Sequence, residues 1–366
     1  MTEKPKGLGI QWIVIILLVL AVFFGWLGYT DGSFFNVYAS GIGIMLLGVA
    51  LTVWLVDYVN RQSQTRLMTI LETQIRQQEE NQTLREEIVL KSQLIRELGS
   101  GDEGLAARAI RVLDEKGWLT DGSLSNAQLV GARLSGAALA WANLSGTFLS
   151  RANLEGADLS YANLHEATLS DAYLERANLS QSTLTDTDLR GVDMSLVNLT
   201  EADLTGATLD EAQLSGATMV DANLHQAQAS RATFNGANLE RANLVQADLT
   251  YSSFERTGLS GANLGWANMS RANLEKADLT EANLSGTNLD EARLQGANLA
   301  GAFLFGARVS LKALSAAKSL AGATMPDGLK YEDWVRRQAG EDVPDPELPP
   351  ELETPPSPLD YRAEES

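Results

Sequence analysis

Two uninterrupted apolar segments open the chain. Residues 10–28 and 34–56 contain no charged residue, and only residues 29–33 separate them. At about 1.5 Å per helical residue, each segment is long enough to cross the roughly 30 Å hydrocarbon layer of a bilayer. The pattern predicts a transmembrane helical hairpin over residues 1–58, with the lipid bilayer as its partner.

The charges beside the two segments predict how the hairpin is oriented. Lys4 and Lys6 precede the first segment, Arg61 and Arg66 follow the second, and the link between them carries only Asp31. Because Lys and Arg gather on the cytoplasmic side of membrane helices, we expect the N-terminus and everything after the hairpin in the cytoplasm. A signal peptide followed by an anchor is disfavoured, since the first segment is too long and no small-x-small cleavage site is evident after it.

Residue types at the ends of the two segments suit a hairpin in a bilayer. Aromatic anchors are expected near one membrane face at Trp12 and Trp54, and near the other at Trp26, Tyr29 and Tyr38. Small residues four apart, which let helices approach closely, are Ala21 with Gly25 and Ala39 with Gly43.

A polar, helix-favouring connector comes next, over residues 59–117, and its first part, 59–98, contains neither Gly nor Pro. Alternating four- and three-residue spacing relates Leu84, Ile88, Lys91, Ile95 and Leu98, which is typical of a short coiled-coil seam. Self-association through residues 59–98 and a single solvated helix both remain open. A second helix is expected over 105–116, with Leu105, Ala109, Ile110 and Leu113 on one side, and with Trp118 it would form an N-terminal cap for the region after residue 118.

A five-residue period then runs from Leu124 to Val309 in 38 units. Every unit is centred on Leu, Phe, Met or Val except at Ala229, and the residue two before the centre is Ala in 29 of the 38 units. An apolar residue every fifth position leaves no stripe on a helix. Two inward residues two apart are typical of one face of a very short strand, and the other residues must turn the chain. Strand–turn units of fixed length predict a solenoid.

Units such as RANLE at 151–155, GADLS at 156–160 and EADLT at 201–205 resemble the pentapeptide-repeat family, whose motif is A(D/N)LXX. The resemblance implies an all-β solenoid, a right-handed quadrilateral β-helix with four pentapeptides per coil, here over residues 118–310. It also implies that each central Leu and the small residue before it point inward. The full architecture is then this β-helix preceded by a two-helix transmembrane hairpin and a helical connector.

Twenty residues per coil predict which side chains stack. Leu124, Leu144 and Leu164 begin one inward ladder, while Ala229 leaves a gap in another that Phe234 is expected to fill. The position two before each repeat centre, which is usually Ala, holds Ser182, Thr187, Val192 and Val197 in four successive repeats. These residues suggest a bulge or bend over 182–197. Outward pairs of opposite charge are Arg151 with Asp171, Glu211 with Arg231, Asp221 with Arg241, and Arg271 with Glu291.

Both ends of a solenoid need covering, because its last strands have unpaired edges. Residues 311–330 are expected to form a C-terminal cap, with a helix over 311–320 and a turn at Pro326–Gly328. Residues 331–366 are expected to be an acidic, Pro-rich, disordered tail, because seven of the nine prolines lie within 341–366.

Little in the composition suggests chemistry. The chain has no Cys, which removes disulfides, thiolate metal sites and a Cys nucleophile. Its two histidines, His165 and His225, lie three coils apart, about 14 Å at the inter-strand spacing, too far for one metal ion. We therefore predict no enzyme, no cofactor, and no catalytic, cofactor-binding or metal-ligating residue. Several aromatic residues are expected to point outward, and they form either a surface for a partner or scattered caps. These are Trp141 and Tyr161, which should stack on each other, and Trp266, Phe303 and Phe305.

The leading functional prediction is a non-catalytic, membrane-anchored cytoplasmic scaffold or protein-interaction module with an unidentified protein partner. The net charge of −19, with 22 acids against 11 bases in residues 121–309, argues against direct nucleic-acid binding. The resemblance implies one alternative, since some family members resemble B-DNA in size and charge and bind type II topoisomerases. It also leaves open whether the membrane is a bacterial plasma membrane or a thylakoid membrane.

Overall fold

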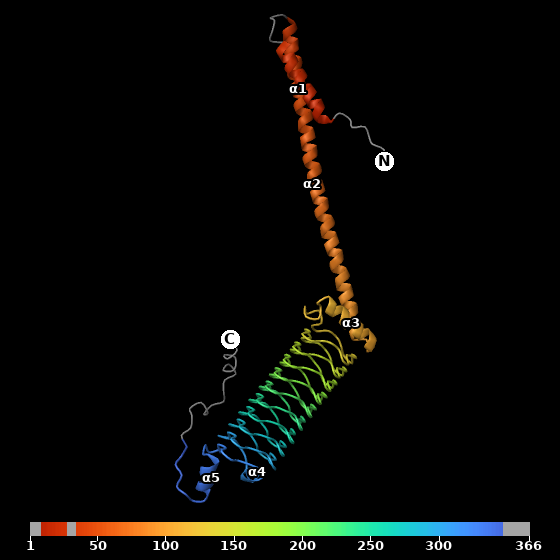
Figure 1. Ribbon diagram of the computed structural model, residues 1–366. Coiled ribbons are helices and arrows are strands. Elements are labelled where there is room, and N and C mark those ends of the chain that lie inside the picture. The colour runs from red at the N-terminus through yellow and green to blue at the C-terminus, as the bar shows by residue number, and fades with distance from the viewer. Residues whose placement is uncertain (1–8, 28–33, 347–366) are drawn as a thin grey trace. The chain divides into compact units, whose positions relative to one another are not determined.

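The computed structural model describes residues 9–27 and 34–346, and the expected link at 29–33 lies outside them. The chain forms two compact units that divide between residues 88 and 89. Figure 1 labels five helices, and their bounds are α1 Ile10–Leu27, α2 Phe34–Leu98, α3 Glu103–Glu115, α4 Leu311–Ser315 and α5 Tyr331–Gln338.

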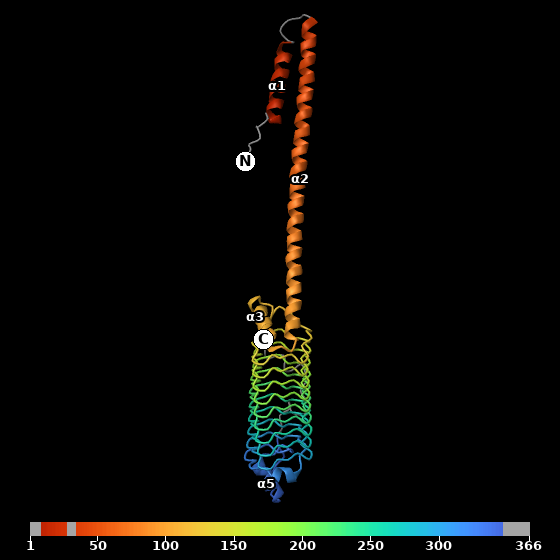
Figure 2. The same cartoon turned by 90° about the vertical axis from the view of Figure 1, so that its right-hand side faces the viewer.

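The first unit pairs α1 with the beginning of α2, and both ribbon views show the two side by side (Figures 1 and 2). Ile10, at the start of α1, lies beside Val53 and Val56 of α2, so the two helices run antiparallel. Helix α2 then continues through the connector to Leu98 as one helix of 65 residues. Its length follows from composition, because neither Gly nor Pro occurs between residues 49 and 98.

Small residues lie at the contact between α1 and α2. Ala21 and Ala50 are buried there, and so is Gly43. Two of the expected small residues, Ala21 and Gly43, therefore serve close packing, whereas the side chains of Gly25 and Ala39 lie outside the described part of the chain.

The second unit is a stack of coils, coloured yellow to blue in Figures 1 and 2. Single-residue parallel bridges join positions twenty apart, from Gln128 with Phe148 to Asn288 with Arg308, and each coil contributes four such bridges. Leu134 N donates to Asn153 O at 2.7 Å, and Asn153 N donates to Ala132 O at 2.9 Å. This is the twenty-residue register that the sequence predicts.

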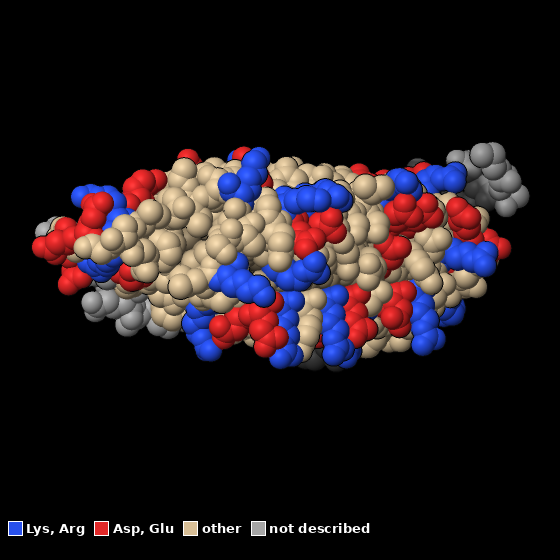
Figure 3. All heavy atoms as spheres, turned by 90° about the horizontal axis from the view of Figure 1, so that it is seen from below, with Lys and Arg blue, Asp and Glu red and all other residues tan. Residues whose placement is uncertain are grey.

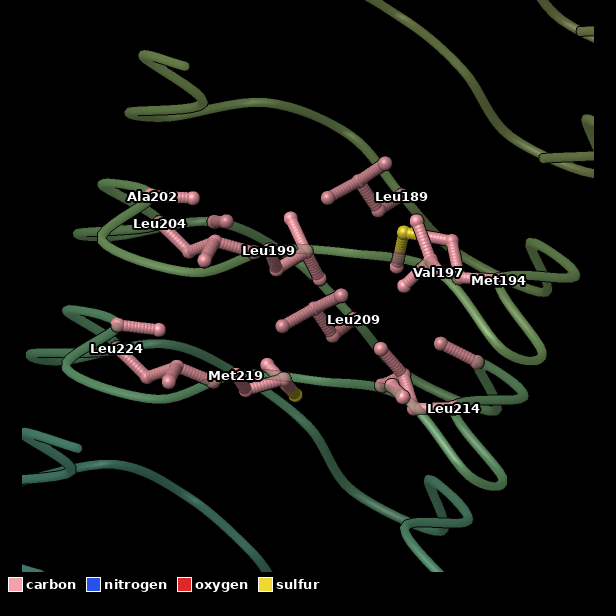
Figure 4. Packing of buried hydrophobic residues seen from close by; sticks show 14 of the residues in the cluster. Leu189, Met194, Val197, Leu199, Ala202, Leu204, Leu209, Leu214, Met219 and Leu224 are labelled. Carbon is pink, nitrogen blue, oxygen red and sulfur yellow. The ribbon is translucent and has the colours of Figure 1, made fainter. Parts of the chain in front are cut away.

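The core of the second unit consists of the two inward positions of each repeat. Figure 4 shows Leu204 and Leu224 stacked one coil apart, with Ala202 beside them. These side chains are fully buried. Each repeat turns at a residue in the left-handed region, such as Gly156 with φ 64° or Arg151 with φ 59°, and this turn is why glycine recurs at the position.

The expected bulge over residues 182–197 is not there. Bridges with a spacing of twenty run through it without a shift, including Thr183 with Asp203 and Asp193 with Gln213. The unusual residues fit because the buried Ser182 hydroxyl donates to Leu179 O at 2.7 Å, which satisfies its polar atom. Val197 is accommodated beside the unbranched Met194, a side chain that adapts readily to irregular space (Figure 4).

The first coil is closed by α3 together with the end of α2. Helix α3 buries Ala106, Ala109, Ile110 and Leu113, while Leu105, expected on that face, is exposed. Leu94 and Leu98 of α2 are buried in the same core, and Ile95 packs against it. Lys91 Nζ lies 2.8 Å from Asp121 Oδ2 and 4.7 Å from the centre of the Trp118 ring. The C-terminal half of the expected coiled-coil seam is therefore used within the second unit.

The last coil ends differently from the expectation. Helix α4 spans only Leu311–Ser315, and the chain then resumes the stack, with Ser319 bridging Asn298 and Thr324 bridging Phe303. The spacing is now twenty-one, so a single extra residue lets the ladder continue beyond the repeat.

Residues 331–338, which the sequence placed in the disordered tail, form helix α5. Its Tyr331 and Trp334 pack against the core, and Glu332 Oε1 accepts a hydrogen bond from Gly322 N at 2.8 Å. Two apolar rings among polar residues are enough to dock this short helix. Residues 347–366 of the expected tail lie outside the described residues.

Candidate interaction surface

The two histidines do not form a site. His165 Nδ1 lies 2.8 Å from Thr185 Oγ1, one coil away, whereas His225 is buried at its own corner of the stack. Within residues 9–27 and 34–346, no three His, Cys, Asp or Glu side chains converge as a metal site requires. The outward surface of the coils is therefore the candidate for binding.

Charge is distributed unequally among the four sides of the stack. We call one side, residues 131–136 and their equivalents every twenty residues through 291–296, the mixed-charge side. It holds eight of the eleven bases of residues 121–309, together with eight acids. The side ten residues further along each coil, 121–126 and equivalents through 301–306, holds seven acids and one base, and we call it the acidic side.

Positive charges on the mixed-charge side are largely neutralised in place. Arg231 lies 3.4 Å from Glu211, and Arg271 lies 2.9 Å from Glu291, each across one coil. Within one coil, Arg176 pairs with Glu175 and Arg256 with Glu255. Figure 3 shows a face on which positive and negative side chains lie next to one another in this way.

Three of the four expected outward pairs form ion pairs. The third is Arg241 with Asp221 at 2.7 Å, on the acidic side. Arg151 and Asp171 form none within the described residues. The Asp171 carboxylate instead lies over the next coil, where a Cβ added to Gly191 would come within 2.8 Å of Asp171 Oδ1. Exposed ion pairs of this kind each contribute about 1 kcal/mol or less to stability. Their main effect is to avoid the repulsion that like charges would cause if they stacked on neighbouring coils.

Acidic-side carboxylates mostly lack a Lys or Arg partner among the described residues. Glu166, Asp186, Glu201 and Glu281 are exposed at its two corner rows, and the single base, Arg241, is already paired with Asp221. Asp221 has a lowered pKa because it accepts a hydrogen bond from Arg241. This side consequently presents a row of negative charge to solvent.

The comparison with known families decides what these coils are. The family model described as pentapeptide repeats matches eight copies between residues 123 and 309, with residue 266 between the last two matched ranges. The chain belongs to the pentapeptide-repeat family. No curated protein sequence shows significant similarity to it.

Solved structures of pentapeptide-repeat proteins match part of this chain. HetL from the cyanobacterium Nostoc sp. strain PCC 7120, described as involved in heterocyst differentiation regulation, is 32% identical. The match covers 61% of this chain and 98% of HetL, with a TM-score of 0.31. QnrB1, a plasmid-mediated fluoroquinolone resistance protein, is 16% identical over 52% of this chain and 97% of its own, with a TM-score of 0.43.

A third similar structure is a pentapeptide repeat protein of the Arabidopsis thaliana thylakoid lumen. It is 27% identical over 34% of this chain and 66% of its own, with a TM-score of 0.14.

Aromatic side chains on this pentapeptide-repeat domain do not gather into one patch. Trp141 and Tyr161 stack as predicted, with ring centroids 4.1 Å apart and planes at 2°. Trp266 lies on another corner row, and Phe303 and Phe305 near the last coil are half-buried. The segregation of charge is therefore the clearer surface feature. Sequence reasoning found the pairs but missed this segregation, which becomes visible only when charges are summed by side.

Proposed function

We propose that this chain is a membrane-anchored, non-catalytic interaction module. Its parts are a transmembrane hairpin, residues 1–58, a helical connector, 59–117, and a cytoplasmic repeat domain, 118–310. The repeat domain would have the right-handed quadrilateral coil that the family resemblance implies. The observation that carries this proposal is the large number of exposed apolar side chains on the paired apolar parts of α1 and α2.

The contact between α1 and α2 buries only one stripe of each helix. Val19 and Val22 on α1 are 62% and 67% exposed, and Ile44 and Met45 on α2 are each 75% exposed. Such a surface in water would be an aggregation hazard, whereas hydrocarbon tails solvate it on every side. Among the described residues, one helix, α2, is long and apolar enough to span a membrane, and the apolar part of α1 is shorter.

Aromatic and charged residues beside the apolar surface support the orientation predicted from the sequence, with the N-terminus in the cytoplasm. Trp12 and Trp54 both lie at the end of the helix pair where α1 begins, which suits an aromatic belt at one membrane face. Arg61, ion-paired with Asp57 at 2.9 Å, lies in α2 just after its apolar part, and Arg66 comes soon after. Under the positive-inside rule this end is cytoplasmic, and so are the coils beyond it.

The membrane part is tested by extraction. Full-length protein should stay in the membrane pellet after an alkaline carbonate wash. The double substitution Val19→Arg with Leu47→Arg should release it, because each Arg near a span centre costs about 3 kcal/mol of insertion free energy. Val19→Leu with Leu47→Ile is the matched control. Wild-type protein in the soluble fraction would overturn the proposal.

The acidic side is the surface that we assign to the partner, a protein with a basic face. Removing its exposed carboxylates through Glu166→Gln, Asp186→Asn, Glu201→Gln and Glu281→Gln should abolish proximity labelling of the partner in its own cell. The matched control removes the same number of charges from the mixed-charge side through Glu155→Gln, Asp171→Asn, Glu211→Gln and Glu291→Gln. Equal loss in both variants would contradict the assignment.

A second candidate is an acidic mimic of DNA that modulates a type II topoisomerase or another DNA-binding protein. The acidic side supports it, and opposite-charge pairs do not argue strongly against it, since most of them lie on the mixed-charge side. The purified chain should then inhibit DNA supercoiling by gyrase or protect the enzyme from quinolones. No inhibition and no protection would remove this candidate.

A further inference from the structure

One face of α2, within the first unit, carries a heptad register with four apolar and three polar seam positions. Its a and d positions, at alternating spacings of three and four, are Leu67, Ile70, Gln74, Gln77, Asn81, Leu84 and Ile88. The four apolar members are each between 54% and 58% exposed. A helix whose a and d side chains are solvated over three heptads is typical of one strand of a coiled coil that lacks its partner strand.

The pattern has a defined C-terminal limit. The next seam positions are Lys91, Ile95 and Leu98, and all three are engaged in the second unit. Lys91 pairs with Asp121, and Ile95 and Leu98 pack against or within the core. Pairing between copies therefore has to end at Ile88.

Polar layers in the middle of the seam point to another copy of the same helix. Gln74, Gln77 and Asn81 line one shallow groove along α2. Within the described residues their side chains make no hydrogen bond, so their amide donors and acceptors are available. Against an identical helix in register, each amide meets its own counterpart and can exchange hydrogen bonds. An Asn at an a position is the residue that favours two parallel strands, because other registers leave it unpaired.

Charged residues beside the seam also favour two parallel helices in register. Glu80 occupies a g position and Arg85 the e position five residues later, which face each other between the two strands of a parallel dimer. Their opposite signs form two attractive pairs per dimer. Neither side chain has an ion pair within the described part of the chain, so both are available.

We propose that two copies of this chain pair through α2 as a parallel, two-stranded coiled coil over residues 67–88. The dimer presents two repeat domains together, so a partner with two binding sites is held by avidity. The inference does not rest on the membrane or on the acidic side, and it stands if either of those proposals fails.

The test uses the full-length protein in the cells that produce it and exploits the absence of Cys from the chain. Single substitutions Leu67→Cys, Leu84→Cys and Ile88→Cys should each give a disulfide-linked dimer on mild oxidation. Glu79→Cys and Glu86→Cys, at the outward f positions, are the controls and should cross-link at least about tenfold less. Equal cross-linking at seam and f positions overturns the proposal. So does linkage found only between Leu67→Cys and Ile88→Cys chains, which would mean antiparallel helices.

A charge exchange provides an independent readout in detergent solution. Glu80→Arg or Arg85→Glu alone should raise the dimer dissociation constant roughly tenfold, as two attractive pairs become repulsive. The double variant Glu80→Arg with Arg85→Glu should restore it. A dissociation constant that none of these variants changes, or a mass that shows three or more copies, contradicts the two-stranded parallel pairing.

Discussion

Phe234 and Phe254 stack inside the coils, with ring centroids 4.7 Å apart and planes inclined by only 2°. Both rings are fully buried at a position that is Leu in most other repeats. Ala229, also buried, is the one repeat centre too small to fill its place. A large residue next to a small one keeps the volume of the core constant.

We expect Phe234→Ala to destabilise the repeat domain more than Leu239→Ala. Loss of the ring removes more buried apolar surface and leaves Phe254 without its stacked neighbour. The costs should be about 4 kcal/mol for the Phe and about 3 kcal/mol for the Leu. Thermal melts followed by circular dichroism measure the difference, and equal midpoints would show that Phe234 has no special part in the packing.

The relation to Ala229 gives a sharper version of this prediction. Ala229→Leu should destabilise the wild type by about 1–3 kcal/mol, because we expect Phe234 to fill the space beside the small Ala229. In a Phe234→Leu background the same substitution should be neutral or stabilising. Additive effects in this double-mutant cycle would mean that the two sites do not share a volume.

The repeat geometry could be predicted because the five-residue period constrains every coil in the same way. Once twenty residues make a coil, Trp141 must lie over Tyr161, and they do stack. The expected bulge near Ser182 failed for a local reason. A buried hydroxyl that bonds to Leu179 O fits the small position as well as Ala does, and residue type alone does not show that bond.

A clash between corner residues predicts unequal effects of the same substitution. Gly286 and Gly236 both have positive φ, at 63° and 67°, so either Gly→Ala change costs about 1 kcal/mol of backbone strain. A Cβ on Gly236 meets nothing within 4 Å, whereas one on Gly286 would lie 2.6 Å from the Trp266 ring. Gly286→Ala should therefore lower the melting temperature clearly more than Gly236→Ala does. Adding Trp266→Ala should cancel the excess. If the two single variants melt together, the ring moves aside freely.

Stability should fall in acid, because several aspartates have lowered pKa values in the folded chain. The hydrogen bond from Arg190 lowers the pKa of Asp188, and that from Arg241 lowers the pKa of Asp221. A pKa lowered on folding stabilises the protein above the ordinary value of 3.8, and this stabilisation is lost as the pH falls through the folded value. Unfolding midpoints in urea between pH 7 and pH 2 measure it.

Asp188→Asn should flatten this pH profile while lowering stability slightly at neutral pH. The matched control is Asp186→Asn, because Asp186 forms no ion pair among the described residues and Asn is tolerated at its positive φ of 57°. An equal flattening in both variants would assign the acid effect to overall charge instead of the Arg190 contact.

The ends of the repeat domain were the least predictable part. Period and composition suggested that the repeat stops near Val309. The bridge between Thr324 and Phe303, in a ladder shifted by one residue, could not be predicted, because the five-residue repeat no longer applies there. Charge segregation was likewise hidden, because it appears only when the charges of positions twenty residues apart are summed side by side. The two apolar segments of the first unit, by contrast, are long enough for composition alone to predict them as helices.

Helix α5 should therefore be part of the folded domain. Truncation after residue 330 removes Tyr331 and Trp334, exposes the core they cover and removes the hydrogen bond from Tyr331 N to Ala323 O, so it should lower the melting temperature and promote aggregation. Truncation after residue 346 removes only Pro-rich acidic sequence and should leave the melt unchanged. A milder variant, Trp334→Ala, should lie between the two. If truncation after residue 330 melts like the full-length chain, α5 does not cap the stack.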